Sequence, residues 1–104
     1  MEHATEYMLF PENFGKDMSL EETCLSNGKV YTILTNKGAH GGKGALAAMI
    51  RGVASDTVSS ILKIVSYKVR RKAETVTRDL SLGMMMTVCI AFPKTTLVND
   101  LFHV

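Results

Sequence analysis

The sequence predicts an α/β protein with a mixed β-sheet and the element order β-β-β-α-β-α-β. Residues 19–52 contain three segments rich in β-branched, aromatic or small apolar side chains, separated by glycine-containing turns. After residue 52, two segments have apolar residues at helical spacing, and each is followed by a short segment typical of a strand. A strand-helix-strand unit connects parallel strands through a right-handed crossover. The last two strands therefore join the antiparallel ones in a mixed sheet with helices packed against it.

The length and composition indicate one globular domain. The chain has 104 residues, of which 46% are hydrophobic and 21% charged, and it carries a formal net charge of +2. This composition excludes a disordered chain, and the net charge is too small to indicate a nucleic-acid partner. We expect residues 1–18 to form a lead-in segment, broken by Pro11 and Gly15, that packs an aromatic cluster onto a core at residues 19–104.

Two features of the sequence bear on the compartment. Cys24 and Cys89 lie far apart and form no C-x-x-C motif, so neither a zinc site nor a disulfide framework is indicated. The first ten residues include acidic side chains and no long apolar run, which argues against a signal peptide or a membrane span. We therefore expect a cytoplasmic protein with free thiols.

The first three strands form a predicted meander. The alternating segment SLEETCLS (19–26) is the first strand, and Asn27-Gly28 predicts a type I′ hairpin turn, in which both central residues have positive φ. KVYTILTN (29–36) then pairs antiparallel with it, and ALAAMIRG (45–52) is interpreted as a third strand buried on both faces. The intervening GAHGGKGA lacks the spacing and the hydroxyl of a P-loop, so a flexible hairpin loop is expected.

A helix is expected after the meander. Ser55 is predicted to cap it, with Asp56 in the first turn, where a negative charge suits the helix dipole. The apolar residues that share one face of this helix are Val58, Ile61, Leu62 and Val65. SYKVRRKAE (66–74) is interpreted as a polar, basic connector to a fourth strand, TVTRD (75–79).

A second helix is expected to begin at a Ser81 cap and to end before Pro93, because proline cannot continue the helical hydrogen bonds. Its apolar stripe consists of Leu82, Met85, Met86 and Cys89. The three consecutive methionines at 84–86 are interpreted as core filling with one side chain exposed. TTLVN (95–99) is the fifth strand.

Acidic residues lie in or at the ends of predicted strands that are neighbours. Asp79 ends the fourth strand and Asp100 follows the fifth, while Glu21 and Glu22 belong to the first strand, the expected neighbour of the fourth. Ligands of such sheets gather at the carboxyl ends of parallel strands, and Mg²⁺ and Mn²⁺ favour oxygen ligands. The pattern fits a divalent metal site, and it also fits ordinary caps and turn formers at strand ends.

Two further features have two interpretations each. His103, near Asp100, is either a residue that orients a carboxylate or a metal-bound water, or an ordinary terminal histidine. The basic stretch either contacts DNA phosphates or is a solvated connector. It consists of Lys68, Arg70, Arg71 and Lys72.

Six segments occur in the chain in the order LFPEN, SLEETCLSNGKVYTILTNK, GGKGALAAMIRG, VTRDLSLGM, FPKTTLV and DLFHV. Together they resemble the catalytic core of the DDE transposases of the ISL-three insertion-sequence family, over residues 2–104. The resemblance implies an RNase H-like fold, incomplete at the C-terminus. It also implies a metal-dependent enzyme, with Mg²⁺ or Mn²⁺, that cuts and rejoins DNA at transposon ends by means of three carboxylates.

The resemblance also implies particular site residues. By position, the first catalytic and metal-binding carboxylate of the family falls on Glu21 and the second on Asp79. The D-x-F-H-V signature of the family is matched at the end of the fifth strand by Asp100, Phe102 and His103. In the family this signature leads into a longer helical region and the third carboxylate, which the 104 residues do not contain.

Three departures from the family bear on activity. Glu21 stands where the family usually has Asp, Arg78 brings a charge into a strand expected to be central and buried, and Leu101 replaces a basic residue. With the third carboxylate missing, these departures favour a truncated transposase core that is inactive alone. The alternative is a non-catalytic interaction or dimerisation module, because the fifth strand is expected at an exposed sheet edge.

Overall fold

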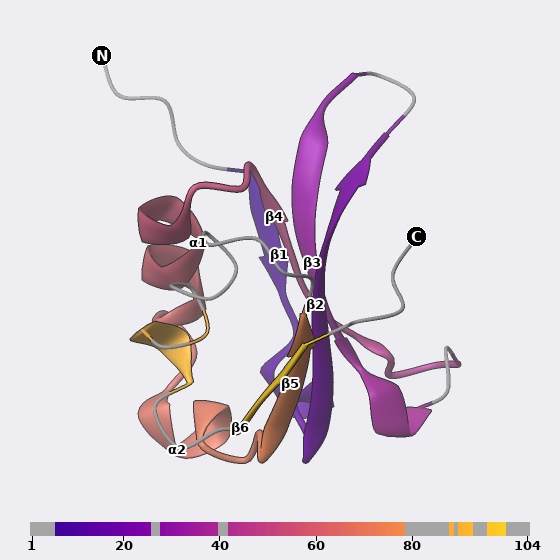
Figure 1. Ribbon diagram of the computed structural model, residues 1–104, viewed down its shortest axis with the longest axis vertical. Coiled ribbons are helices and arrows are strands. Elements are labelled where there is room, and N and C mark those ends of the chain that lie inside the picture. The colour runs from indigo at the N-terminus through magenta and orange to yellow at the C-terminus, as the bar shows by residue number, and fades with distance from the viewer. Residues whose placement is uncertain are drawn as a thin grey trace.

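A computed structural model describes residues 6–25, 28–39, 42–78, 88, 90–92 and 96–99 of the chain. The strands are β1 Tyr7–Leu9, β2 Asp17–Cys24, β3 Val30–Asn36, β4 Leu46–Arg51, β5 Thr75–Arg78 and β6 Thr96–Asn99. The helices are η1 Pro11–Asn13, η2 Lys37–Ala39, α1 Ser55–Leu62 and α2 Tyr67–Arg70. The strands form one sheet in the order β1-β4-β3-β2-β5-β6, and α1 and α2 lie against one of its faces (Figure 1).

The sheet is mixed, as the sequence predicts. β2, β3 and β4 form an antiparallel meander, whereas β5 pairs parallel with β2 and β6 pairs parallel with β5. In the β2–β3 hairpin the amide of Leu25 donates to the carbonyl of Lys29 over 2.9 Å, and Gly28 has a φ of 80°. Glycine adopts positive φ without steric cost, so the predicted positive φ is confirmed at Gly28, while Asn27 lies outside the described residues. The predicted two-residue type I′ turn is wrong, because the amide of Gly28 donates to the carbonyl of Leu25 over 2.9 Å and the loop that Leu25 and Lys29 close has three residues.

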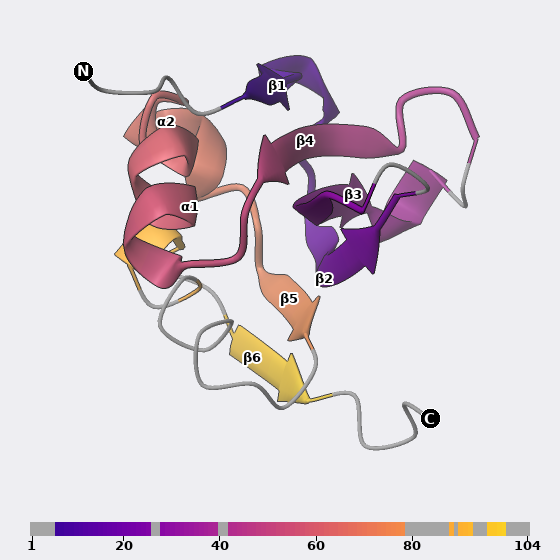
Figure 2. The ribbon, with the colours of Figure 1, turned by 90° about the horizontal axis from the view of Figure 1, so that it is seen from above.

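One strand, β1, is not predicted from the sequence. It pairs antiparallel with β4, with Met8 opposite Met49, and Figure 2 shows β1 and β6 at opposite edges of the sheet. A strand of three residues is too short to produce a recognisable alternation. The aromatic packing expected from residues 1–18 is present, because the ring centroid of Phe14 lies 6.3 Å from that of Phe92.

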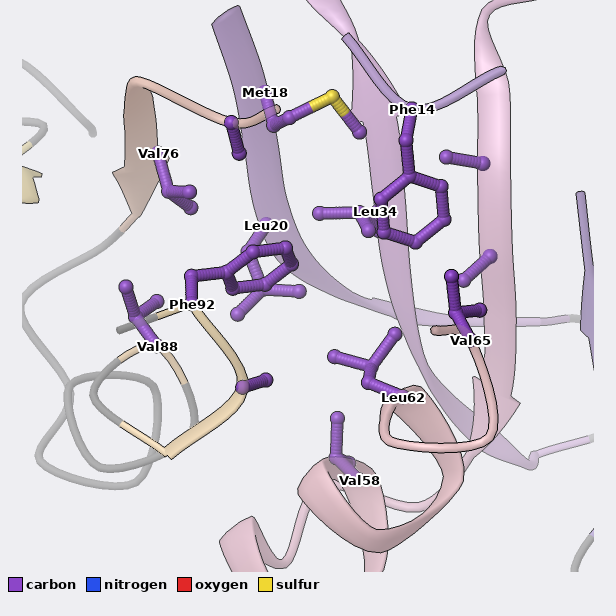
Figure 3. Packing of buried hydrophobic residues seen from close by; sticks show 14 of the residues in the cluster. Phe14, Met18, Leu20, Leu34, Val58, Leu62, Val65, Val76, Val88 and Phe92 are labelled. Carbon is purple, nitrogen blue, oxygen red and sulfur yellow. The ribbon is translucent and has the colours of Figure 1, made fainter. Parts of the chain in front are cut away.

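The core lies between the sheet and the helices. Met18 and Leu20 of β2 point to the same side of the sheet as Val76 of β5, towards the side chains of α1 (Figure 3). The predicted apolar face of α1 is confirmed for Val58 and Leu62, which are buried, and for Ile61, which packs against them partly buried. Val65 is also buried, but it lies after the end of α1. The other labelled residues of this core are Phe14, Leu34, Val88 and Phe92.

The start of α1 differs from the prediction by one residue. The capping position is held by Ala54, whose extended backbone has φ −65° and ψ 130°, and no side chain caps the helix. Ser55 is instead the first helical residue, so its predicted role as a cap is wrong. Asp56 lies in the first turn, as predicted, and its carboxylate accepts a hydrogen bond of 2.8 Å from the amide of Thr57.

The predicted polar connector at residues 66–74 contains helix α2 and a buried arginine. The hydroxyl of Ser66 caps α2 by accepting a hydrogen bond from the amide of Val69 at 3.3 Å. Arg70 is buried, and its guanidinium donates to the carbonyl of Val65 at 3.0 Å and to that of Ala91 at 2.8 Å. The interpretation as a solvated connector is therefore wrong for Arg70, because the guanidinium finds carbonyl acceptors inside the protein.

Two other predictions are only partly met within the described residues. β4 is not buried on both faces, since Ala48 and Ile50 are buried while Met49 is half-buried and Arg51 is exposed. The predicted second helix falls largely outside the described residues, including its Ser81 cap and the stripe of Leu82, Met85, Met86 and Cys89. Val88, Ile90 and Ala91 are helical, and Val88 and Ala91 are buried.

Candidate active site on the open face of the sheet

Side chains of β2 and β5 alternate between the helix-covered face of the sheet and the opposite face. Met18, Leu20 and Val76 are buried under the helices, and successive side chains of a strand point to opposite faces. We call the opposite face the open face. The β2 and β5 side chains that point to it include Asp17, Ser19, Glu21, Thr75 and Thr77. The parallel pair therefore presents a polar strip there.

Glu21, the first predicted carboxylate, is exposed on the open face. It lies opposite Ile33 of β3, and the ladder to β5 pairs Ser19 with Thr77 two residues earlier. Glu22 is also exposed but points to the other face, because neighbouring residues alternate. Of these two acidic residues, Glu21 is the one that shares a face with Thr77 of the parallel strand.

The second predicted carboxylate, Asp79, lies outside the described residues. The described β2–β5 ladder ends with Leu20 opposite Arg78, and Glu21 and Asp79 are the next residues along the two sequences. Their proximity stays a prediction. The family-signature residues that follow β6 also lie outside the described part of the chain: Asp100, Phe102 and His103. Arg78 itself is 3% exposed, in agreement with the expectation of a charge in a buried central strand.

Two hydrogen bonds hold side chains of the polar strip in place. Near the start of the strands, the hydroxyl of Thr75 donates to the carboxylate of Asp17 over 2.7 Å. Farther along, the Lys37 ammonium donates to the Thr77 hydroxyl over 3.0 Å. Lys37 belongs to η2 and lies 40 residues from Thr77 in the sequence. The sequence contains no signal for this contact, because it depends on how β3, β2 and β5 are ordered in the sheet.

The turn that carries Lys37 is positioned by an asparagine. The side chain of Asn36 accepts a hydrogen bond of 2.9 Å from the amide of Gly38 and donates one of 3.1 Å to the carbonyl of Asn13. The Asn13 side chain in turn donates to the carbonyl of Leu46 over 2.8 Å. Asparagine commonly forms such a hydrogen bond to the backbone two residues on. The start of η2 is thus held in place at the end of β3.

The described residues supply only part of a metal site. None of their His, Cys, Asp and Glu side chains come together in a group of three or more that could hold a metal ion. Glu21 offers carboxylate oxygens of the kind that Mg²⁺ prefers, and the hydroxyls of Ser19 and Thr77 are neutral oxygen donors on the same face. A divalent metal site on the open face therefore requires Asp79 as well.

The predicted basic stretch lies on the other side of the sheet, in and after α2 (Figure 1). Lys68, Arg71 and Lys72 are exposed there. That these three residues contact DNA stays a prediction. Arg70 is no longer a candidate for such a contact, because it is buried. These cations stand on the helix side, whereas Glu21 points to the open face.

An ion-pair group and a shallow pocket lie at the β1 edge of the sheet. Arg51 donates a 2.9 Å hydrogen bond to the carboxylate of Glu6, and Lys29 approaches it to 3.6 Å. The hydrogen bond from Arg51 and the charge of Lys29 lower the pKa of Glu6. A shallow hollow lies beside this group, lined by Glu6, Tyr7, Met8, Tyr31 and Met49. Neither feature includes Glu21. None of the helices in the described part of the chain is long and apolar enough to cross a bilayer.

Comparison with known proteins gives one family for most of the chain. A family model described as a transposase, that of the DDE transposases of the ISL-three insertion sequences, matches residues 18–104. The matched range includes β2 from Met18 onward, with Glu21, and every later element of the sheet. No curated protein matches the chain.

Proposed function

Because this chain belongs to the ISL-three family of DDE transposases, we propose that Glu21 and Asp79 are two of its catalytic carboxylates, which hold Mg²⁺ or Mn²⁺ for cleavage and transfer of DNA strands. The observation that carries the proposal is the parallel register of β2 and β5, which pairs Ser19 with Thr77 and Leu20 with Arg78. Continued by one residue, this register would pair Glu21 with Asp79. Alternation along both strands would then direct the two carboxylates to the open face.

The proposed chemistry assigns separate tasks to the residues of this face. Glu21 and Asp79 bind the cation and fix its position relative to the sheet. Bound there, a divalent ion supplies activation of a water molecule and stabilisation of the leaving oxygen in phosphodiester cleavage. The DNA partner, in the family the transposon end, would lie along the open face, which α1 and α2 do not cover (Figure 1).

We also propose that the 104 residues do not cleave DNA on their own. The residues carried over from the family include two of its three carboxylates. Glu21 is one methylene longer than the Asp that the family usually has, and Mg²⁺ requires a nearly ideal octahedron with ligands at about 2.0 Å. Both features weaken metal binding and leave the site unable to position a scissile phosphate.

Titration of Mg²⁺ and Mn²⁺ into the protein, followed by NMR of the β2 amides, tests the metal site. We expect shifts at Ser19–Glu21 with a dissociation constant on the order of 1 mM, lost in Glu21→Gln and in Asp79→Asn. Glu22→Gln is the matched control, because it removes the neighbouring carboxylate from the opposite face. Equal titrations in all four proteins, or none in the wild type, would refute the site.

A plasmid-nicking assay tests the proposed inactivity separately. We expect no cleavage above that of the Glu21→Gln variant in either metal. Metal-dependent nicking by the wild-type chain that disappears in Glu21→Gln would overturn the inactivity and support the catalytic assignment.

A second function, that of a non-catalytic interaction or dimerisation module, is favoured by one observation. β6 is the last strand in the sheet order and pairs with β5 on one side. An edge strand presents backbone N–H and C=O groups that another strand can pair with. Sedimentation equilibrium tests this alternative: a dimer that a proline in place of Val98 dissociates would support it, and a monomer at all concentrations would refute it.

A further inference from the structure

We propose that Lys37 binds a phosphate of the DNA on the open face, next to the carboxylate site. This inference rests on the proposed function, which brings DNA to that face. It concerns a residue that neither the sequence motifs nor the family resemblance singles out.

The position of Lys37 follows from the order of the strands. η2 follows β3, and the last residue of β3, Asn36, lies opposite Met18 near the start of β2. β2 stands between β3 and β5. To reach the hydroxyl of Thr77 on β5, the Lys37 side chain must therefore cross β2 on the open face. In Figure 1, the magenta turn that contains η2 stands on the side of the sheet away from α1 and α2.

The Thr77 contact places the Lys37 ammonium close to Glu21 along the sheet. Thr77 pairs with Ser19, and Glu21 follows Ser19 by two residues on the same face. Two residues of a strand span about 6.6 Å. A phosphate that the ammonium binds would thus lie beside the proposed metal site, within the length of one nucleotide or two.

The charge of Lys37 is not neutralised by the described residues. It is exposed, and the described ion pairs join Glu6 to Lys29 and Arg51 at the other edge of the sheet. Its hydrogen-bond partner, Thr77, is neutral. An ammonium has three N–H donors, so one bond to a hydroxyl fixes its position and leaves donors for an anion.

The surroundings of Lys37 favour a phosphodiester over other anions. A cation does not ligate a metal ion, so Lys37 cannot belong to the metal-binding set itself. The negative charge of Glu21 repels the phosphates of approaching DNA. The positive charge of Lys37, held close to Glu21, offsets this repulsion for a polyanion that contacts both residues. The hydrogen bond to the Thr77 hydroxyl holds the Lys37 ammonium over the strip before DNA arrives, which lowers the entropy lost on binding.

Fluorescence anisotropy with a labelled 20-base-pair duplex tests the contact. The full chain and its variants are titrated in EDTA at several KCl concentrations, so that metal binding plays no part. One phosphate contact changes the slope of log K against log [KCl] by about 1. We expect Lys37→Gln to lose that amount and to bind several-fold more weakly, and Lys37→Arg to retain the slope. Lys63→Gln is the matched control, an exposed lysine after α1 on the helix side, and should behave as the wild type.

The outcomes separate this inference from the proposed function. A Lys37→Gln slope equal to that of Lys63→Gln, or no binding of the duplex by the wild type at low salt, would overturn the inference. A Lys37-dependent slope without metal binding at Glu21 would support the DNA contact and refute the metal site. Thr77→Val keeps the shape of the strand but removes the hydroxyl, and we expect it to weaken binding with the slope unchanged.

Discussion

Arg70 holds the helical segments together through its hydrogen bonds. Its guanidinium joins two carbonyls that are far apart in the sequence, those of Val65 after α1 and Ala91. The side chain is 9% exposed, and its guanidinium carbon also lies 5.8 Å from the ring centroid of Tyr67. Replacement by methionine keeps an apolar stem of similar length and removes the donors.

The expected loss of stability follows from the two carbonyls. A buried acceptor left without its partner costs about 1–3 kcal/mol, so two of them cost about 2–6 kcal/mol. The total stability of a domain is about 5–15 kcal/mol, and 1 kcal/mol shifts the Tm of a chain this size by about 4–8 °C. We therefore expect Arg70→Met to lower the Tm by at least about 8 °C.

Thermal and urea unfolding followed by circular dichroism measure this loss. Arg71→Met is the matched control, because Arg71 is exposed, and a surface substitution of this kind changes stability by less than about 0.5 kcal/mol. Arg70→Lys should fall between the two, since an ammonium cannot span both carbonyls as the planar guanidinium does. Equal stabilities of Arg70→Met and Arg71→Met would refute the reasoning.

Three further predictions concern the rest of the fold. Gly15→Ala would bring a Cβ to 2.6 Å from the side-chain amide nitrogen of Asn36. This nitrogen would move and lose its hydrogen bond to the carbonyl of Asn13, so we expect the free energy of unfolding measured in urea to fall by about 1–3 kcal/mol. Gly52 has a φ of 105°, and Gly52→Ala should cost about 1–3 kcal/mol through backbone strain, whereas alanine at Gly42, whose φ is not positive, should cost less. The lowered pKa of Glu6 means that its contribution to stability is present above its ordinary value of 4.5 and is lost as the pH falls through the folded-state pKa. Arg51→Gln should raise this pKa towards the ordinary value in an NMR titration, and an unchanged pKa would contradict the assignment of Arg51 as its main cause.

The features that the sequence predicted correctly depend on local pattern. The alternation in β2, the β-branched and aromatic residues of β3, the glycine of their hairpin and the spacing of Val58 and Leu62 each involve residues close together in the chain. The parallel pairing of β5 with β2 follows from the handedness of the crossover. The motif order also led to the transposase family, which the family model confirms over residues 18–104.

The features that the sequence missed depend on partners that are distant in the chain. Arg70 reads as a solvated cation because nothing near it reveals the carbonyl of Ala91, 21 residues away. Ser55 was assigned as a cap from its type, whereas the backbone dihedrals at Ala54 decide the capping position. The small apolar run at 45–52 predicts a strand buried on both faces, but α1 and α2 lie against the face to which Ala48 and Ile50 point, and on the other face Met49 is half-buried and Arg51 exposed.

By itself, the sequence determined the strands of the meander, the two parallel strands, the helix at α1 and the family. That Glu21 and Asp79 carry chemistry stays a prediction. Only the tertiary structure decided which cation reaches the parallel strands on the open face. Lys37 and Arg70 are both basic residues next to polar segments, yet one crosses the open face to Thr77 and the other is buried between carbonyls. The reason is physical. Strand order and helix packing decide which hydrogen-bond partners a side chain has. Local periodicity cannot predict these partners, because the contacts form only when the sheet assembles.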